Sequence, residues 1–114
     1  MPRPRTNIQP RIVEAARARF LADGVDGASL REIARDAGTN IGMIAYYFKT
    51  KDELFLAVIE EVYAAMLADM ARILRAPGAA RQRLRNAFAR LGKASDLELD
   101  VIRLIIREGM SSST

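Results

Sequence analysis

Residues 29–48 read SLREIARDAGTNIGMIAYYF, two short helical patterns on either side of a glycine. The first pattern opens with a capping box, in which the Ser29 side chain can accept from the backbone N–H of Glu32 and Glu32 can reach back to Ser29. Gly38 follows the last apolar position, where a glycine commonly ends a helix. The first half of the stretch therefore predicts a capped helix over residues 29–37.

The second half predicts a short helix over residues 40–48, with Asn40 as its N-cap. Ile44, Tyr47 and Phe48 are spaced to share one face, which would pack inward. The opposite face is only weakly polar, which is unusual for a surface that meets only water. It consists of Ile41, Gly42, Met43, Ala45 and Tyr46. Two short helices across a tight glycine turn form a helix-turn-helix, with a generic three-helix bundle as the alternative.

The residues before this stretch predict a first helix over residues 8–23. Asn7 is its candidate N-cap, Pro10 falls in the first turn where its missing N–H is tolerated, and Gly24 ends it. The three helices together predict a small shared core. Its members are Phe20, Leu30, Ile33, Ala34, Ala37, Ile44 and Phe48.

The residues after the stretch predict three further helices. A second capping box opens a long helix over residues 50–74, and helices over about 79–91 and 96–107 follow. No segment shows the apolar–polar alternation of a strand. We therefore expect an all-α fold in two parts, a three-helix domain with a helix-turn-helix over residues 1–50 and the first helices of a C-terminal helical bundle over residues 51–114.

The composition excludes many classes of site. The chain of 114 residues has no Cys, which removes disulfides, thiolate metal sites and cysteine nucleophiles, and no His, the commonest general base and metal ligand. The carboxylates of the later helices lie at spacings typical of solvated faces. We therefore predict no catalytic residues, no metal site and no cofactor. The longest uncharged run, residues 37–48, contains Asn, Thr and two Gly, so no membrane segment is expected and a cytoplasmic location follows.

The positive charge lies in the first half of the chain. Residues 1–51 hold nine Lys and Arg against five Asp and Glu, a surplus of four that equals the net charge of the whole chain, +4. A local basic surplus is what phosphate binding needs, although a solvated surface would look much the same. Arg3 and Arg5 lie in a basic arm that could reach an adjacent minor groove or could remain an unstructured tail.

Several segments at fixed spacing resemble one protein family. They are RIVEAARARF (11–20), Gly24, SLREIA (29–34), Ala37-Gly38 and YFKTKDEL (47–54). Together they are similar to the tetracycline-repressor (TetR/AcrR) family of bacterial transcription regulators over about residues 8–62. The resemblance implies an N-terminal domain that binds operator DNA and a larger C-terminal helical domain that dimerises and binds a small effector.

The resemblance also implies that the helix over residues 40–48 reads bases and that its neighbours contact phosphates. The implied DNA-contacting residues are Ser29, Arg31, Asn40, Ile41, Gly42, Met43, Tyr46, Tyr47 and Lys51. Arg31 is the best candidate for reading guanine, because the helix over 40–48 carries no Arg, Lys or Gln. Ser29, Tyr47 and Lys51 correspond to phosphate-contacting positions, so Lys51→Ala is expected to weaken binding to all DNA and to flatten its salt dependence.

Some of these residues have a plainer interpretation. Lys51 is otherwise a surface lysine, Tyr47 a core aromatic, and Ile41 and Met43 are core residues or contacts with a partner. Ala45 stands where many family members carry a larger side chain, often tyrosine, so a backbone contact there is expected to be missing. No effector-binding residues are predicted.

Our leading hypothesis is a sequence-specific transcriptional repressor that binds a palindromic double-stranded operator as a homodimer and is released by a small molecule. The alternative is a helical module that binds protein through Ile41, Met43 and Tyr46 without binding DNA. Because family members run to roughly two hundred residues, we expect residues 51–114 to be part of a longer effector-binding and dimerisation domain. A naturally short protein that pairs through its last three helices is the alternative.

Overall fold

Helix α1 (Ile8–Gly27) forms around an apolar stripe and changes direction at a glycine. Gly24 has φ 78° and ψ 167°, a conformation that is essentially restricted to glycine, so the helix is interrupted there as predicted. One further helical stretch reaches Gly27, beyond the predicted end. The computed structural model describes residues 8–111, and the predicted N-cap Asn7 lies outside that range.

Helices α2 (Leu30–Ala37) and α3 (Ile41–Tyr47) are both capped as predicted. The Ser29 hydroxyl accepts from the backbone N–H of Glu32 at 3.2 Å, and Gly38 ends α2 in the left-handed conformation with φ 75°. The Asn40 Oδ1 atom accepts from the backbone N–H of Met43 at 2.9 Å. These local hydrogen bonds fix where α2 ends and where α3 begins.

Helix α4 (Lys51–Arg75) begins at Thr50, whose hydroxyl accepts from the backbone N–H of Glu53 at 3.1 Å. The Glu53 carboxylate in turn accepts from the backbone N–H of Lys49 at 2.9 Å, one residue before the N-cap. Helix α5 (Ala80–Leu91) then matches its predicted extent closely. Helix α6 (Asp96–Ser111) runs past its predicted end at residue 107, because Gly109 does not interrupt it.

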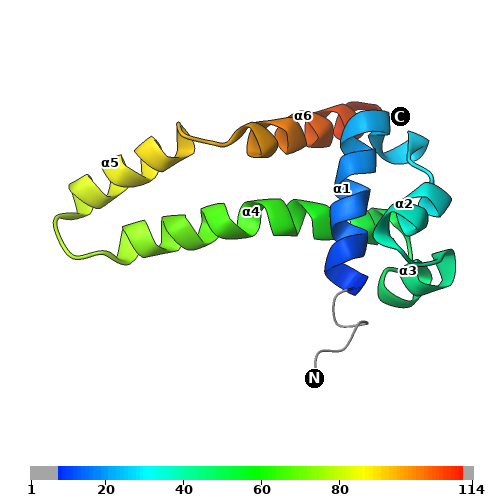
Figure 1. The fold of residues 1–114 in the computed structure, drawn as a ribbon. Coiled ribbons are helices and arrows are strands. Elements are labelled where there is room, and N and C mark those ends of the chain that lie inside the picture. Colours follow the sequence, from blue (N-terminus) through cyan, green and yellow to red (C-terminus); the bar gives the residue numbers. More distant parts are fainter. Residues whose placement is uncertain (1–7, 112–114) are drawn as a thin grey trace, which may run out of the picture.

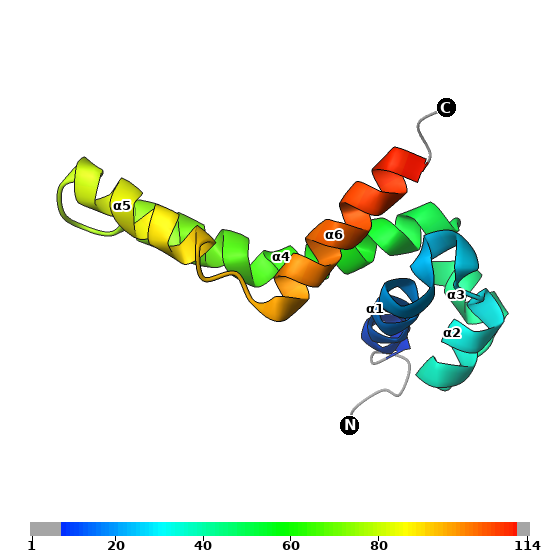
Figure 2. The same ribbon diagram turned by 90° about the horizontal axis from the view of Figure 1, so that it is seen from above.

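The six helices of residues 8–111 form a head and an arm. The head consists of α1, α2 and α3, and the arm is the hairpin of α4 and α5, which projects away from the head (Figure 1). Helix α6 returns from the arm to the head, beside α1 and across α4 (Figure 2). The radius of gyration of 17.1 Å exceeds the roughly 13 Å of a compact domain of this length, because the arm is extended.

One hydrophobic core joins the head to the two helices behind it. Phe20, Ile33, Leu54 and Val58 are fully buried, and the rings of Phe20 and Phe55 meet edge to face at 5.7 Å. The core predicted for the head is buried except for Leu30, which is half-buried and packs against it. No helix of residues 8–111 is both long enough and apolar enough to cross a membrane.

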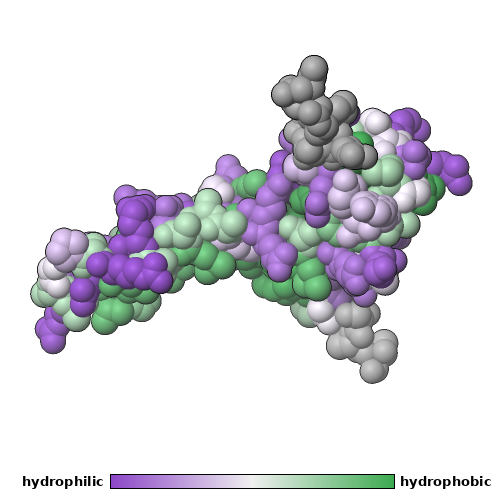
Figure 3. Space-filling model, turned by 90° about the horizontal axis from the view of Figure 1, so that it is seen from below, coloured by the Kyte–Doolittle hydropathy of each residue, from purple (hydrophilic) through white to green (hydrophobic). Residues whose placement is uncertain are grey.

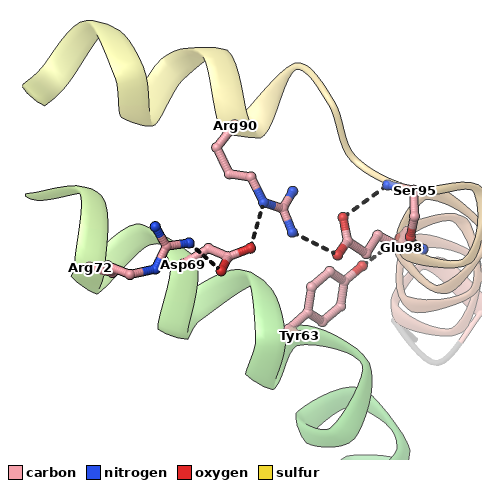
Figure 4. A network of polar contacts seen from close by, with 6 residues as sticks. All are labelled: Tyr63, Asp69, Arg72, Arg90, Ser95 and Glu98. Atoms are coloured by element: carbon pink, nitrogen blue, oxygen red, sulfur yellow. Dashed lines mark hydrogen bonds and ion pairs between the residues drawn. The ribbon is translucent and has the colours of Figure 1, made fainter.

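A polar network joins α4, α5 and α6 at the base of the arm (Figure 4). The Arg90 guanidinium lies 3.2 Å from the Asp69 carboxylate and 3.3 Å from the Glu98 carboxylate, so it bridges α4 and α6. The Tyr63 hydroxyl donates to the backbone carbonyl of Glu98 at 2.6 Å, and the backbone N–H of Ser95 donates to its carboxylate at 3.0 Å. These bonds set the position of α6 along α4.

The same contacts shift the pKa values of the two carboxyl groups. The backbone N–H of Ser95 and then the Arg90 guanidinium lower the pKa of Glu98, whose side chain is only 8% exposed. Hydrogen bonds from Arg72 and Arg90 lower the pKa of Asp69. The network is therefore held by charged carboxylates.

Helix α5 carries four apolar residues on one side, Leu84, Ala87, Phe88 and Leu91, and this side is largely exposed. Of its four members only Ala87 is buried, while Phe88 is 73% and Leu84 is 56% exposed. Hydrophobic surface runs along the arm (Figure 3). The arm consists of only two helices, α4 and α5, so no further helix covers the outer side of either one.

Candidate nucleic-acid interface

The outward side of α3 is apolar and uncharged. Ile41, Gly42, Ala45 and Tyr46 are all exposed, and at 100° per residue they cover roughly 140° of the helix circumference. Tyr46 is 76% and Ile41 is 39% exposed. Because these residues project from one side of a helix at the surface of the head, they form one continuous surface, which we call the α3 face.

Asn40 and Gly42 shape the start of this face. The Asn40 Oδ1 atom is occupied by the backbone N–H of Met43. A Cβ atom at Gly42 would lie only 3.1 Å from that Oδ1 atom, so any side chain there would press on the cap. The absence of a side chain at Gly42 therefore preserves the Asn40 cap and leaves the helix backbone accessible at this point of the face.

Met43 and Tyr47 lie toward the inner side of α3. Both are half-buried, and Ile44 between them is buried in the core. The sequence placed Met43 on the outward face with Ile41 and Tyr46, but its side chain lies only at the edge of that face. The Tyr47 ring packs against the core and meets the Tyr46 ring edge to face at 5.0 Å.

Cations of the head divide into paired and unpaired side chains. Arg19 lies 2.8 Å from the Asp36 carboxylate, and Arg17 lies 2.9 Å from Glu61. The hydrogen bond with Asp36 raises the pKa of Arg19, and the same bond lowers the pKa of Asp36. These pairs hold α1 against α2 and α4. Because each arginine is paired with a carboxylate, its charge contributes less to binding an anionic partner.

Two further cations of the head are Arg31 on α2 and Lys49 just after α3. Both side chains are exposed, and neither has a carboxylate partner among the residues that the structure describes. Lys49 lies with Ile41 and Ala45 around a hollow of about 60 Å³ between α3 and the start of α4. Lys49 is not among the DNA-contacting residues predicted from the sequence, although its position just before the N-cap Thr50 marks it as a residue at the surface of a turn.

Lys51 has a structural role that the sequence did not predict. Its ammonium group donates to the backbone carbonyls of Ala28 at 2.9 Å, Val25 at 3.1 Å and Asp26 at 3.4 Å. These carbonyls belong to the connection between α1 and α2. Lys51 therefore ties that connection to the first turn of α4, and its contact with phosphate stays a prediction.

A carboxylate from the other end of the chain holds the same connection. The Glu108 Oε2 atom accepts from the backbone N–H of Val25 at 3.1 Å. Glu108 and Val25 are far apart in sequence, so no local signal predicts this bond. The peptide groups on both sides of Val25 are thus fixed, one by α4 and one by α6.

Ser29, Arg3 and Arg5 complete the set of residues predicted to contact DNA. Ser29 is half-buried at the start of α2, and its hydroxyl caps that helix. Arg3 and Arg5 lie outside the described residues. The structure thus places Lys49 beside the α3 face and leaves Arg31 exposed on α2. Ser29, Asn40 and Lys51 form hydrogen bonds within the protein.

Comparison with known proteins gives one consistent family. Residues 12–58 match the family model described as bacterial regulatory proteins, tetR family. The chain is 37% identical over 59 residues to the probable HTH-type transcriptional regulator YttP of Bacillus subtilis, which covers 52% of this chain and 28% of that protein. It is 38% identical over 61 residues to the HTH-type transcriptional repressor AcnR of Corynebacterium glutamicum, which covers 54% of this chain and 32% of the repressor.

Solved structures extend the similarity beyond the head. A crystal structure from Mesorhizobium loti assigned to the TetR family aligns with 96% of this chain and 57% of its own, with a TM-score of 0.67 and 26% identity. A TetR-family regulator from Streptomyces coelicolor aligns with 90% of this chain and 59% of its own, with a TM-score of 0.61 and 26% identity. The chain thus spans about a third or less of these curated relatives and somewhat more than half of these structures. The helix-turn-helix head, the order of the six helices in residues 8–111 and these matches agree: residues 12–58 match the tetR family of bacterial regulatory proteins, and the chain is similar to members of that family.

Proposed function

We propose that this protein is a sequence-specific DNA-binding transcriptional regulator. The observation that carries the proposal is the α3 face, an exposed helix surface that projects from a helix-turn-helix and has the exposed Lys49 beside it. A helix of this kind fits the major groove of B-DNA, about 12 Å wide, while cations beside it meet the phosphates. Relatives named as HTH-type transcriptional regulators and repressors support the same activity.

We further propose that the protein acts as a repressor in the bacterial cytoplasm, as a homodimer on a palindromic operator. Two copies of the head would read half-sites about one helical turn, roughly 34 Å, apart. A small molecule bound in the C-terminal helices would release the operator. The relatives NicS of Pseudomonas putida and AcnR are named as repressors, which supports the direction of control.

The proposal is tested by selecting bound sequences from random duplexes with the full chain, followed by gel shifts with selected and scrambled DNA. Arg31→Ala should relax the preference for one base, since a guanidinium reads guanine through two hydrogen bonds. Lys49→Ala should weaken binding to all sequences alike and lower the slope of log K against log salt by about 0.9. Absence of any enriched sequence, with affinity independent of salt, would contradict the proposal.

A second candidate function is a protein-binding module, because Tyr46 is 76% exposed on an otherwise apolar face. Aromatic anchors of this kind dominate many protein interfaces. Salt distinguishes the two candidates. DNA binding weakens steeply as salt rises, whereas an apolar protein contact hardly changes.

A further inference from the structure

We propose that the α3 face recognises its operator through the C5-methyl groups of thymine. This inference rests on the proposed DNA-binding function and adds the chemistry of the sequence that is read. The α3 face here means Ile41, Gly42, Ala45 and Tyr46, as defined above.

The chemistry of the major groove selects thymine. Guanine presents two acceptors, adenine an acceptor and a donor, and cytosine a donor, whereas thymine also presents an apolar methyl group. Helix α3 carries no charged or amide side chain, and the amide oxygen of the residue before it, Asn40, is engaged by Met43. A face without cationic or amide donors gains little from the edges of guanine or adenine, and it gains most from an apolar group.

The geometry of the face suits methyl contacts. Ile41 and Ala45 are one turn apart, so their side chains are neighbours about 6 Å apart along the helix axis, far enough to reach two different base pairs. Gly42 between them adds no side chain and lets the backbone approach the bases closely. Tyr46 extends the apolar surface with its ring and carries a hydroxyl at the tip.

Lys49 lies beside the face and not on it, around the small hollow that it shares with Ile41 and Ala45. Its positive charge is therefore placed to contact phosphate, while the centre of the face stays apolar. The expected half-site therefore has thymines, on either strand, opposite α3.

The test removes the methyl groups from the DNA. Half-sites are first obtained by selection with the full chain, and each thymine is then replaced in turn by deoxyuracil, which lacks only the C5-methyl group. Each methyl group that the protein buries should cost about a fourfold loss in affinity, as expected for one buried carbon. Deoxyuracil outside the half-site, the matched DNA control, should leave the affinity unchanged.

A double-mutant cycle then assigns the contact to the protein. In Ile41→Ala the deoxyuracil substitution opposite Ile41 should lose most of its effect, because the methyl group has already lost its partner. In Lys49→Ala the same substitution should keep its full effect, since a phosphate contact is independent of the methyl group. Tyr46→Ala serves as the second face variant, and circular dichroism checks that each variant is folded.

The outcomes separate the inference from the function it rests on. Binding that is selective and salt-dependent, but unchanged by deoxyuracil at every thymine of the half-site, overturns methyl recognition and leaves the DNA-binding function intact. A half-site with only guanine and cytosine opposite α3 does the same. Failure to bind any duplex overturns both proposals.

Discussion

Replacing Lys51 by Met tests the most unexpected contact of the head. Met keeps an unbranched apolar side chain but removes the ammonium group that donates to the carbonyls of Ala28 at 2.9 Å and Val25 at 3.1 Å. Both bonds are partly buried, and the third, to Asp26 at 3.4 Å, is exposed. The substitution therefore leaves two carbonyls of the α1–α2 connection without their charged partner.

The expected cost follows from these two bonds. A hydrogen bond that replaces one to water contributes a net ~1 kcal/mol, somewhat more with a charged donor, and the long exposed bond contributes little. We expect Lys51→Met to lower the free energy of unfolding by about 2 kcal/mol, or the melting temperature by roughly 8 °C in a chain of this size. Urea unfolding followed by circular dichroism measures the change.

Lys49→Met is the matched control, because the Lys49 side chain is exposed and has no carboxylate partner among residues 8–111. Its free energy of unfolding should change by less than ~0.5 kcal/mol. In DNA binding, Lys49→Met should lower the slope of log K against log salt by about 0.9. If Lys51→Met has the same free energy of unfolding as the unchanged chain, its ammonium group does not stabilise the α1–α2 connection, and the reasoning is refuted.

Three other changes probe the rest of the structure. Gly24→Ala should lower the free energy of unfolding, measured in urea, by about 2 kcal/mol, because φ 78° with ψ 167° is strained for any residue with a side chain. Gly109→Ala within α6 should raise it slightly, because alanine favours a helix over glycine. Equal effects of the two substitutions would contradict this account. Tyr63→Phe should cost about 1 kcal/mol by losing the 2.6 Å bond to the carbonyl of Glu98, and an unchanged urea midpoint would show that water replaces it. The pKa values of Glu98 and Asp69 are lowered in the folded state, so their contribution to stability is complete above about pH 5, beyond the unfolded-state values, and is lost as the pH falls through the folded-state values. Urea midpoints measured at pH 7, 4 and 3 should decline in that order, and a midpoint that holds at pH 3 would contradict this account.

Local signals in the sequence predicted the head well. Ser29, Asn40 and Thr50 each cap a helix through a backbone N–H three residues later, so the caps need nothing beyond the neighbouring residues. The positive φ at Gly24 and Gly38 is equally local. The arrangement of α2 and α3 follows from these helix caps and helix ends, together with the spacing of the apolar residues.

Contacts between distant residues were not predictable in the same way. The bonds of Lys51 to the α1–α2 connection and of Glu108 to Val25 depend on how α4 and α6 pack, which no short pattern encodes. The extension of α6 past residue 107 has the same origin, because the bond of Glu108 holds its last turns against the head. Met43 was placed too far outward because an apolar residue near the edge of a face gives no signal of its direction.

The bonds at Val25 make the head sensitive to the spacing between two other helices. Its carbonyl accepts from Lys51 of α4 and its N–H donates to Glu108 of α6, each at 3.1 Å. A hydrogen bond stretched much beyond about 3.5 Å is lost. If the start of α4 and the end of α6 move apart by more than a few tenths of an ångström, Val25 can follow only one of them, and the residue that introduces the helix-turn-helix loses one of its two supports.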